Sequence, residues 1–251
     1  MARILTDETS LHRKRDSLRK GARQLQSLVR YELGGAVVLL AAGALAYKWW
    51  GPGLLVVGVA ALFVSAGHWM KSKENKDEEG SASAGLQGEQ NVTRLLRDGL
   101  PNDSYIFNDI TLRRGLRSAQ MDHVVVSPRG IFVVETKNWR GLISGDEQEA
   151  QWTQVKRPGE KPMRRANPIL QNRRQINVMQ AVLKAGGIDW PDIFPVLISN
   201  SRNAQFEIHN RSVPILTRFD AVEYMVGQAP SRQYTEAEVT AVIELLMKKA
   251  K

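Results

Sequence analysis

Three residues with the chemistry of a metal-dependent active site lie in two neighbouring apolar runs. The run at 130–137 ends with Glu135 and Lys137, which share one face of a strand because side chains two residues apart point the same way. Asp122 lies in the preceding run. Two adjacent carboxylates repel unless a cation or a proton joins them, so a divalent metal would neutralise both and leave the lysine free to act. A salt bridge at a strand end is the alternative interpretation.

The turn between the two runs decides whether these carboxylates meet. A two-residue turn at 128–129 would place Asp122 directly opposite Glu135, with Cβ atoms roughly 5 Å apart. Proline cannot take the positive φ of the usual two-residue hairpin turns. A three-residue turn would instead pair Asp122 with Thr136 and break the alignment. Both registers are open at this point.

The elements that must position these residues form a mixed α/β domain with the order αβββαβ. The sequence predicts a helix at 86–100, strands at 104–112, 119–127 and 130–138, short strands at 142–145 and 150–155, a helix from 167 to about 184, strands at 193–199 and 213–217, and helices at 217–227 and 235–250. Asn167 is expected to cap its helix, with proline in the first turn. His123 faces away from Asp122 and is expected to be structural.

Four motifs in this order resemble the NERD (nuclease-related) domain of the PD-(D/E)xK, restriction-endonuclease-like superfamily. They are Gly88-Glu89, MDHVVVSPRGIFVVETKNWRG, Trp152 and NPILQN, and together they cover roughly residues 85–185. The resemblance implies a restriction-endonuclease-like αβββαβ core. It also implies that Asp122 and Glu135 are metal ligands for Mg²⁺ or Mn²⁺, that Glu89 is a third acid, and that Lys137 is the catalytic lysine. Gln171 would line the site.

The chemistry so implied is hydrolysis of phosphodiester bonds in DNA or RNA. The net charge of +9 favours a polyanionic partner. Candidate substrate-binding residues are Arg113, Arg114, Arg140 and Arg173, with further basic residues at Arg117, Lys156, Arg157, Lys161, Arg164, Arg165 and Arg174. A domain that binds nucleic acid or a protein without turning it over is the alternative.

The first 85 residues divide into three further segments. Residues 1–32 are basic and predict a helix that is either solvated or lies on a membrane surface. Residues 33–70 predict a transmembrane hairpin, with spans at about 33–50 and 53–70, although a re-entrant hairpin is also compatible. Its glycines would also permit assembly with other membrane helices. Residues 71–85 predict a flexible charged linker, before a domain at 86–251.

The basic flanks of the hairpin predict its orientation. By the positive-inside rule, both termini and the nuclease-like domain would lie on the cytoplasmic side of the inner membrane. The chain has no cysteine and four scattered histidines, which exclude disulfides and argue against a histidine-rich zinc site.

Overall fold

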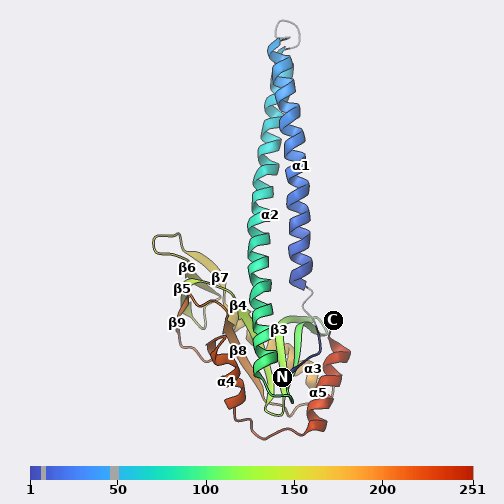
Figure 1. Ribbon diagram of the computed structural model, residues 1–251, viewed down its shortest axis with the longest axis vertical. Coiled ribbons are helices and arrows are strands. Elements are labelled where there is room, and N and C mark those ends of the chain that lie inside the picture. The colour runs from blue at the N-terminus through green and yellow to red at the C-terminus, as the bar shows by residue number, and fades with distance from the viewer. Residues whose placement is uncertain (7–9, 46–50, 251) are drawn as a thin grey trace. The chain divides into compact units, whose positions relative to one another are not determined.

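The computed structural model describes residues 1–6, 10–45 and 51–250. The chain forms two compact units (Figure 1). The first combines the N-terminal residues with the segment from Gly85 onward, and we call it the sheet domain. The second is Ser10–Ala84, which we call the hairpin.

The sheet domain contains two β-sheets. The main sheet has the strand order β1-β2-β3-β4-β8-β10, and a smaller sheet has the order β7-β6-β5-β9. The main strands are β1 (Arg3–Ile4), β2 (Tyr105–Arg114), β3 (Arg117–Ser127), β4 (Gly130–Lys137), β8 (Ile193–Ser199) and β10 (Ile215–Thr217). The others are β5 (Gly141–Asp146), β6 (Gln151–Val155), β7 (Met163–Ala166) and β9 (Ala204–His209).

Helices cover both faces of the main sheet. Helices α3 (Pro168–Ala185) and α5 (Glu236–Lys249) pack on the face that carries Val124 and Val133. The last turns of α2 (Gly51–Gly99) and helix α4 (Asp220–Gly227) pack on the face that carries Val125 and Phe132. The predicted αβββαβ order is confirmed by the last part of α2, β2, β3, β4, α3 and β8, with the small sheet inserted after β4.

The β3–β4 connection is the two-residue turn. Ser127 pairs with Gly130 across it, and the antiparallel register continues to the pair His123 and Val134. Gly130 has φ of +117°, and a Cβ there would approach the carbonyl oxygen of Asp192 to 2.6 Å. Gly130 therefore supplies a positive φ next to the turn, which Pro128, two residues earlier, cannot adopt.

The hairpin consists of α1 (Ser10–Leu45) and the part of α2 up to Ala84, and its seam is made of small and polar side chains. Buried residues recur every seven positions, at Ala22, Val29 and Ala36 in α1 and at Gly58, Ser65 and Ser72 in α2. This spacing is the period of two helices that wind around each other. A Cβ at Gly58 would approach Leu40 to 2.8 Å, so glycine is required for this close packing.

Both hairpin helices are long and apolar enough to cross a membrane, by length and composition. Only 17% of the apolar window in α1 and 11% of that in α2 is buried. The core helix of a soluble protein would bury most of such a window. Large apolar side chains instead face outward, among them Val37, Val38, Leu45, Val56, Val57, Leu62, Phe63 and Val64.

Three expectations from the sequence differ from the structure. Residues 71–85 were expected to be a flexible linker, but they are helical within α2. Packing against α1 stabilises this helix despite its polar composition: Ser72 Oγ donates to the Ala22 carbonyl at 3.3 Å, and Arg19 pairs with Glu79 at 3.8 Å. Residues 1–32 were expected to form one segment, yet Arg3–Ile4 is a strand of the sheet domain.

The third difference concerns β7 and β9, which were not expected. β9 pairs in parallel with β5 and carries the alternating pattern AQFEIH, with Phe206 and Ile208 packed on the small core. That alternation is a strand signal that the sequence does contain. Residues 46–50 of the first expected span lie outside the described residues. The turn expected between the two spans, at Gly51 and Pro52, is instead the helical start of α2.

Candidate active site

Asp122, Glu135 and Lys137 lie on the face of the main sheet that α3 covers. Each shares that face with buried residues two positions away, Val124 for Asp122 and Val133 for Glu135. The register places Asp122 one step beyond the pair His123 and Val134, opposite Glu135. The backbone amide of Thr136 donates a 2.7 Å hydrogen bond to Asp122 Oδ2, which fixes this carboxyl group against β4.

Both carboxylate oxygens of Glu135 have partners. Lys137 Nζ pairs with Oε1, and Gln175 Nε2 donates to Oε2 at 2.7 Å. Glu135 is 1% exposed, whereas the Lys137 side chain is 19% exposed. The glutamate is therefore fixed inside the protein, and the lysine beside it reaches solvent. This ion pair is the salt bridge that the sequence allowed, and it lies next to a second buried acid.

The electrostatics of the site set the charges of Asp122 and Lys137. Burial and the charge of Glu135 raise the pKa of Asp122 to about 8, although Lys137 and the Thr136 amide oppose this shift. Burial lowers the pKa of Lys137, but the charges of Glu135, Asp122 and Glu89 outweigh it and the net pKa is raised. The lysine is therefore a cation at neutral pH, and Asp122 can hold a proton.

Two residues of this site, Asp122 and Glu135, have the chemistry to bind a divalent cation. Asp122 and Glu135 are hard oxygen donors that repel each other, and a cation between them would release the proton that burial and the charge of Glu135 retain on Asp122. Glu89 is half-buried in the last part of α2, and its charge acts on Lys137. Within residues 1–6, 10–45 and 51–250, no cluster of three acidic, histidine or cysteine residues has the geometry of a metal site.

Helix α3 supplies two glutamines to the site. The predicted residue Gln171 accepts a hydrogen bond from Lys137 Nζ at 3.3 Å. Gln175, one turn later, was not predicted; it is 1% exposed and holds Glu135. The signal that could have found it is the spacing of four residues, which places both side chains on one face of the helix. Asn172 anchors the helix by donating to the Val133 carbonyl at 2.9 Å.

The predicted substrate-binding arginines fall into two groups. Arg113, Arg114 and Arg140 are exposed, the first two at the tip of the β2–β3 hairpin. Arg173 pairs with Glu147, a buried acid in the turn after β5, and also donates to Ser212 Oγ at 3.3 Å. The charge of Arg173 is thus neutralised within the protein, since Glu147 needs a counter-ion.

His123 and Asn167 have the structural roles that were expected. His123 is fully buried, its Nδ1 lies 2.8 Å from Asn108 Oδ1, and burial lowers its pKa to about 3. It is neutral and faces away from the carboxylates. Asn167 accepts hydrogen bonds from the Ile169 and Leu170 amides, which makes it the cap of α3.

Comparison with known proteins shows which family the domain that carries this geometry is similar to. Residues 84–200 match the family model of the nuclease-related domain, NERD. The chain is also 35% identical over 102 residues to an uncharacterised protein of Bacillus anthracis. That alignment covers 40% of this chain and 47% of the relative, so the chain spans about half of the relative's length. No solved structure matches the chain.

Proposed function

Because residues 84–200 match the family model of the nuclease-related domain, we propose that this protein is a membrane-anchored nuclease. It would hydrolyse phosphodiester bonds with a divalent cation. The observation that carries the proposal is the convergence of Asp122, Glu135 and Lys137 on one sheet face, with a proton retained by the acid pair. Asp122 and Glu135 would hold Mg²⁺ or Mn²⁺, and Glu89 would add negative charge nearby. The cation supplies a polarised phosphoryl oxygen and an acidified water.

The protein's own residues position the reacting groups. Gln175 and the Thr136 amide hold the two carboxylates in place, so their oxygens need not reorganise when charge develops. Lys137 would keep its positive charge throughout, because its pKa is raised. Its ammonium would stabilise the additional negative charge of the phosphoryl transition state. Gln171 would limit the rotation of this lysine.

A cleavage assay tests the catalytic proposal. The full chain in detergent micelles is incubated with labelled single-stranded and duplex DNA and RNA, with Mg²⁺, Mn²⁺ or EDTA. We expect cation-dependent cleavage that Asp122→Asn and Lys137→Ala each reduce by at least 100-fold. Lys184→Ala, at an exposed position near the end of α3, is the matched control and should retain the parent rate. Cleavage that persists in EDTA or in both site variants would contradict the proposal.

The second candidate function is binding of nucleic acid without cleavage. It is favoured by the occupied oxygens of Glu135 and by the lack of a three-ligand metal cluster among the described residues. Under this function, the same assay would show retention of nucleic acid without cation-dependent cleavage, and neither site variant would alter the affinity.

The membrane part of the proposal rests on the hairpin and on the position of β1. The outward apolar faces of α1 and α2 suit a lipid environment, whereas the buried seam is small and polar. β1 precedes the hairpin in sequence and pairs with β2, which follows it. A single domain cannot occupy two sides of a membrane, so both ends of the hairpin would lie on one side. By the positive-inside rule, the basic flanks favour the cytoplasm as that side.

Single cysteines can test this topology, because the chain has none of its own. Gly53→Cys and Ser81→Cys place thiols at exposed positions near opposite ends of the hairpin part of α2. A membrane-impermeant thiol reagent should label residue 53 in intact cells and residue 81 only after permeabilisation. Labelling of residue 81 in intact cells would contradict the cytoplasmic orientation, and labelling of both residues only after permeabilisation would favour a re-entrant or peripheral hairpin.

A further inference from the structure

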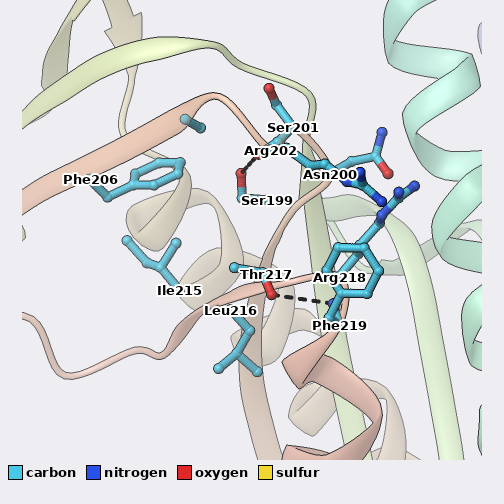
Figure 2. A pocket seen from close by; sticks show the side chains of 11 residues that line it. Ser199, Asn200, Ser201, Arg202, Phe206, Ile215, Leu216, Thr217, Arg218 and Phe219 are labelled. Atoms are coloured by element: carbon cyan, nitrogen blue, oxygen red, sulfur yellow. Dashed lines mark hydrogen bonds between the residues drawn. The ribbon is translucent and has the colours of Figure 1, made fainter.

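A pocket of about 290 Å³ opens beyond the ends of β8 and β10 (Figure 2). It is lined by hydroxyl groups, apolar side chains and the guanidinium groups of Arg202 and Arg218. None of these residues belongs to the nuclease motifs described above. A cavity of this size that combines an apolar wall with a few polar groups is typical of small-ligand sites.

The pocket lies at the same sheet edge as the catalytic lysine. β4, β8 and β10 are parallel neighbours, and the register aligns Lys137 with Ser199 and Ser199 with Thr217. Two strand spacings therefore separate Lys137 from Thr217, about 10 Å. The loop after β8 is also attached to the catalytic strand, because the Asn200 amide donates to the Lys137 carbonyl at 3.0 Å. The pocket and the acid pair are thus parts of one rigid edge.

The charge in the pocket is positive and available to a ligand. The guanidinium groups of Arg202 and Arg218 lie 5.2 Å and 4.8 Å from the centre of the Phe219 ring. Figure 2 shows these three side chains clustered on one side of the pocket. In the part of the chain that the structure describes, neither guanidinium has a carboxylate partner, and the buried Arg218 Nε lacks a hydrogen-bond acceptor. A buried donor without a partner is costly, and an anionic ligand would satisfy it.

The opposite wall of the pocket is apolar. Phe206, Ile215 and Leu216 line it, and the ring of Phe219 is 57% exposed beside the arginines. A ligand that fits both walls has a flat apolar part and an adjacent anionic group. A nucleotide has this composition, because its base stacks on aromatic or guanidinium planes and its phosphate binds arginine.

We propose that this pocket is a subsite for one nucleotide of single-stranded nucleic acid, and this inference rests on the proposed nuclease function. The base would enter between Phe206 and Phe219, and a flanking phosphate would bind Arg202 and Arg218. At a stacked rise of about 3.4 Å per nucleotide, the 10 Å to Lys137 corresponds to roughly three nucleotides. The subsite would therefore hold the strand a short distance from the bond that is cut and favour single strands over duplex.

Binding measurements on four variants test the subsite. The full chain in detergent micelles is titrated in EDTA against a fluorescent 12-nucleotide single strand and the matching duplex, and binding is followed by fluorescence anisotropy. We expect Arg218→Ala and Arg202→Ala to weaken single-strand binding about tenfold and to lower the salt dependence of log K by about one. Phe219→Leu should weaken it by a similar factor without changing that salt dependence. Arg211→Ala, an equal charge change at an exposed position, is the control and should stay within twofold.

Two results separate failure of the subsite from failure of the nuclease function. If the parent binds and cleaves single strands while all pocket variants match Arg211→Ala, the subsite is wrong and the nuclease function stands. If the parent neither binds nor cleaves any nucleic acid, both proposals fall together. Thermal unfolding of each variant is measured in parallel, because a structural role for Arg218 would lower the unfolding temperature together with the affinity. Reduced affinity at unchanged unfolding temperature supports the subsite.

Discussion

The side-chain amide of Gln175 donates a 2.7 Å hydrogen bond to Oε2 of Glu135, while Lys137 holds Oε1 of the same carboxylate. Gln175 also donates to the Gln120 carbonyl at 2.9 Å, so one amide group connects α3, β3 and β4. The glutamate can therefore rotate very little. Outer partners of this kind fix the direction in which a carboxylate presents its oxygens to a cation.

Replacing Gln175 with leucine should weaken cation-dependent cleavage. The variant retains side-chain volume but frees Oε2 of Glu135, and we expect a 10- to 100-fold rise in the Mg²⁺ concentration needed for half-maximal rate. Titrations of Mg²⁺ in the cleavage assay measure this. Gln180→Leu, at an exposed position of the same helix, should behave as the parent. If Gln175→Leu lowers only the unfolding temperature, the residue does not position the carboxylate.

The raised pKa of Asp122 should make the cation-free protein less stable as the pH rises from 6.5 to 8. In this window the folded protein retains a proton on Asp122 up to a pKa of about 8, whereas the unfolded chain, with an ordinary pKa near 3.8, has lost it. The folded state binds more protons, so stability falls with increasing pH by on the order of 1 kcal/mol.

Urea unfolding in EDTA at both pH values measures this change. Asp122→Asn should remove the slope, and a parent protein whose stability rises over the same window would contradict the prediction. The window avoids His123, whose pKa is lowered to about 3 by burial and whose effect appears only below its ordinary value of 6.5.

Cation binding should release a proton from the acid pair. Because Asp122 must ionise before it can act as a ligand, we expect affinity for Mg²⁺ or Mn²⁺ to rise about tenfold per pH unit below pH 8. Calorimetry in two buffers with different ionisation enthalpies measures the released proton directly. Heats that do not depend on the buffer, together with an affinity that is constant from pH 6 to 8, would show that the cation does not use Asp122.

Arg173→Ala should destabilise the folded protein, in addition to any effect on substrate binding. Its partner Glu147 is 2% exposed and would be left as a buried charge, at a cost on the order of 2 kcal/mol. Arg114→Ala, at the exposed hairpin tip, should change stability by less than about 0.5 kcal/mol. It should instead lower the salt dependence of nucleic-acid binding. Unfolding and anisotropy measurements on both variants check this contrast, which would fail if Arg173→Ala left the protein as stable as Arg114→Ala.

Asn167→Ala should destabilise the sheet domain by about 2 kcal/mol, the upper end for a lost helix cap. The side chain caps α3 and also donates to the Glu147 and Glu149 carbonyls at 2.9 and 2.7 Å. Thr235→Ala removes only the capping box of α5 and should cost about 1 kcal/mol. Thermal unfolding of both variants gives the comparison, and equal losses would show that the carbonyl contacts add nothing.

The sequence predicts the part of the site that depends on local rules. Strand alternation placed Glu135 and Lys137 on one face, and the order of elements followed from apolar runs and turn residues. The register of β3 and β4 stayed open, because the choice of turn depends on the backbone of Gly130 and its contact with Asp192. Gln175 was missed because its partner Glu135 lies 40 residues away in sequence, although its spacing of four residues from Gln171 places both glutamines on one helix face.

The errors share one physical cause, which is packing between distant segments. Residues 71–85 have the composition of a linker, but contacts with α1 make them helical. The dipeptide at β1 is too short for any periodicity, so its place in the sheet depends entirely on a strand about 100 residues later.

The position of β1 has a consequence for biosynthesis. Thr6, two residues after β1, exchanges hydrogen bonds with Asn108, a separation of 102 residues. The ribosome therefore produces β1 first, then both apolar helices, and only then the strand that receives β1. The main sheet cannot close at this edge until the hairpin has been synthesised, so both hairpin helices are complete before the sheet domain is. A delay in synthesis of the hairpin would thus delay closure of the main sheet at β1.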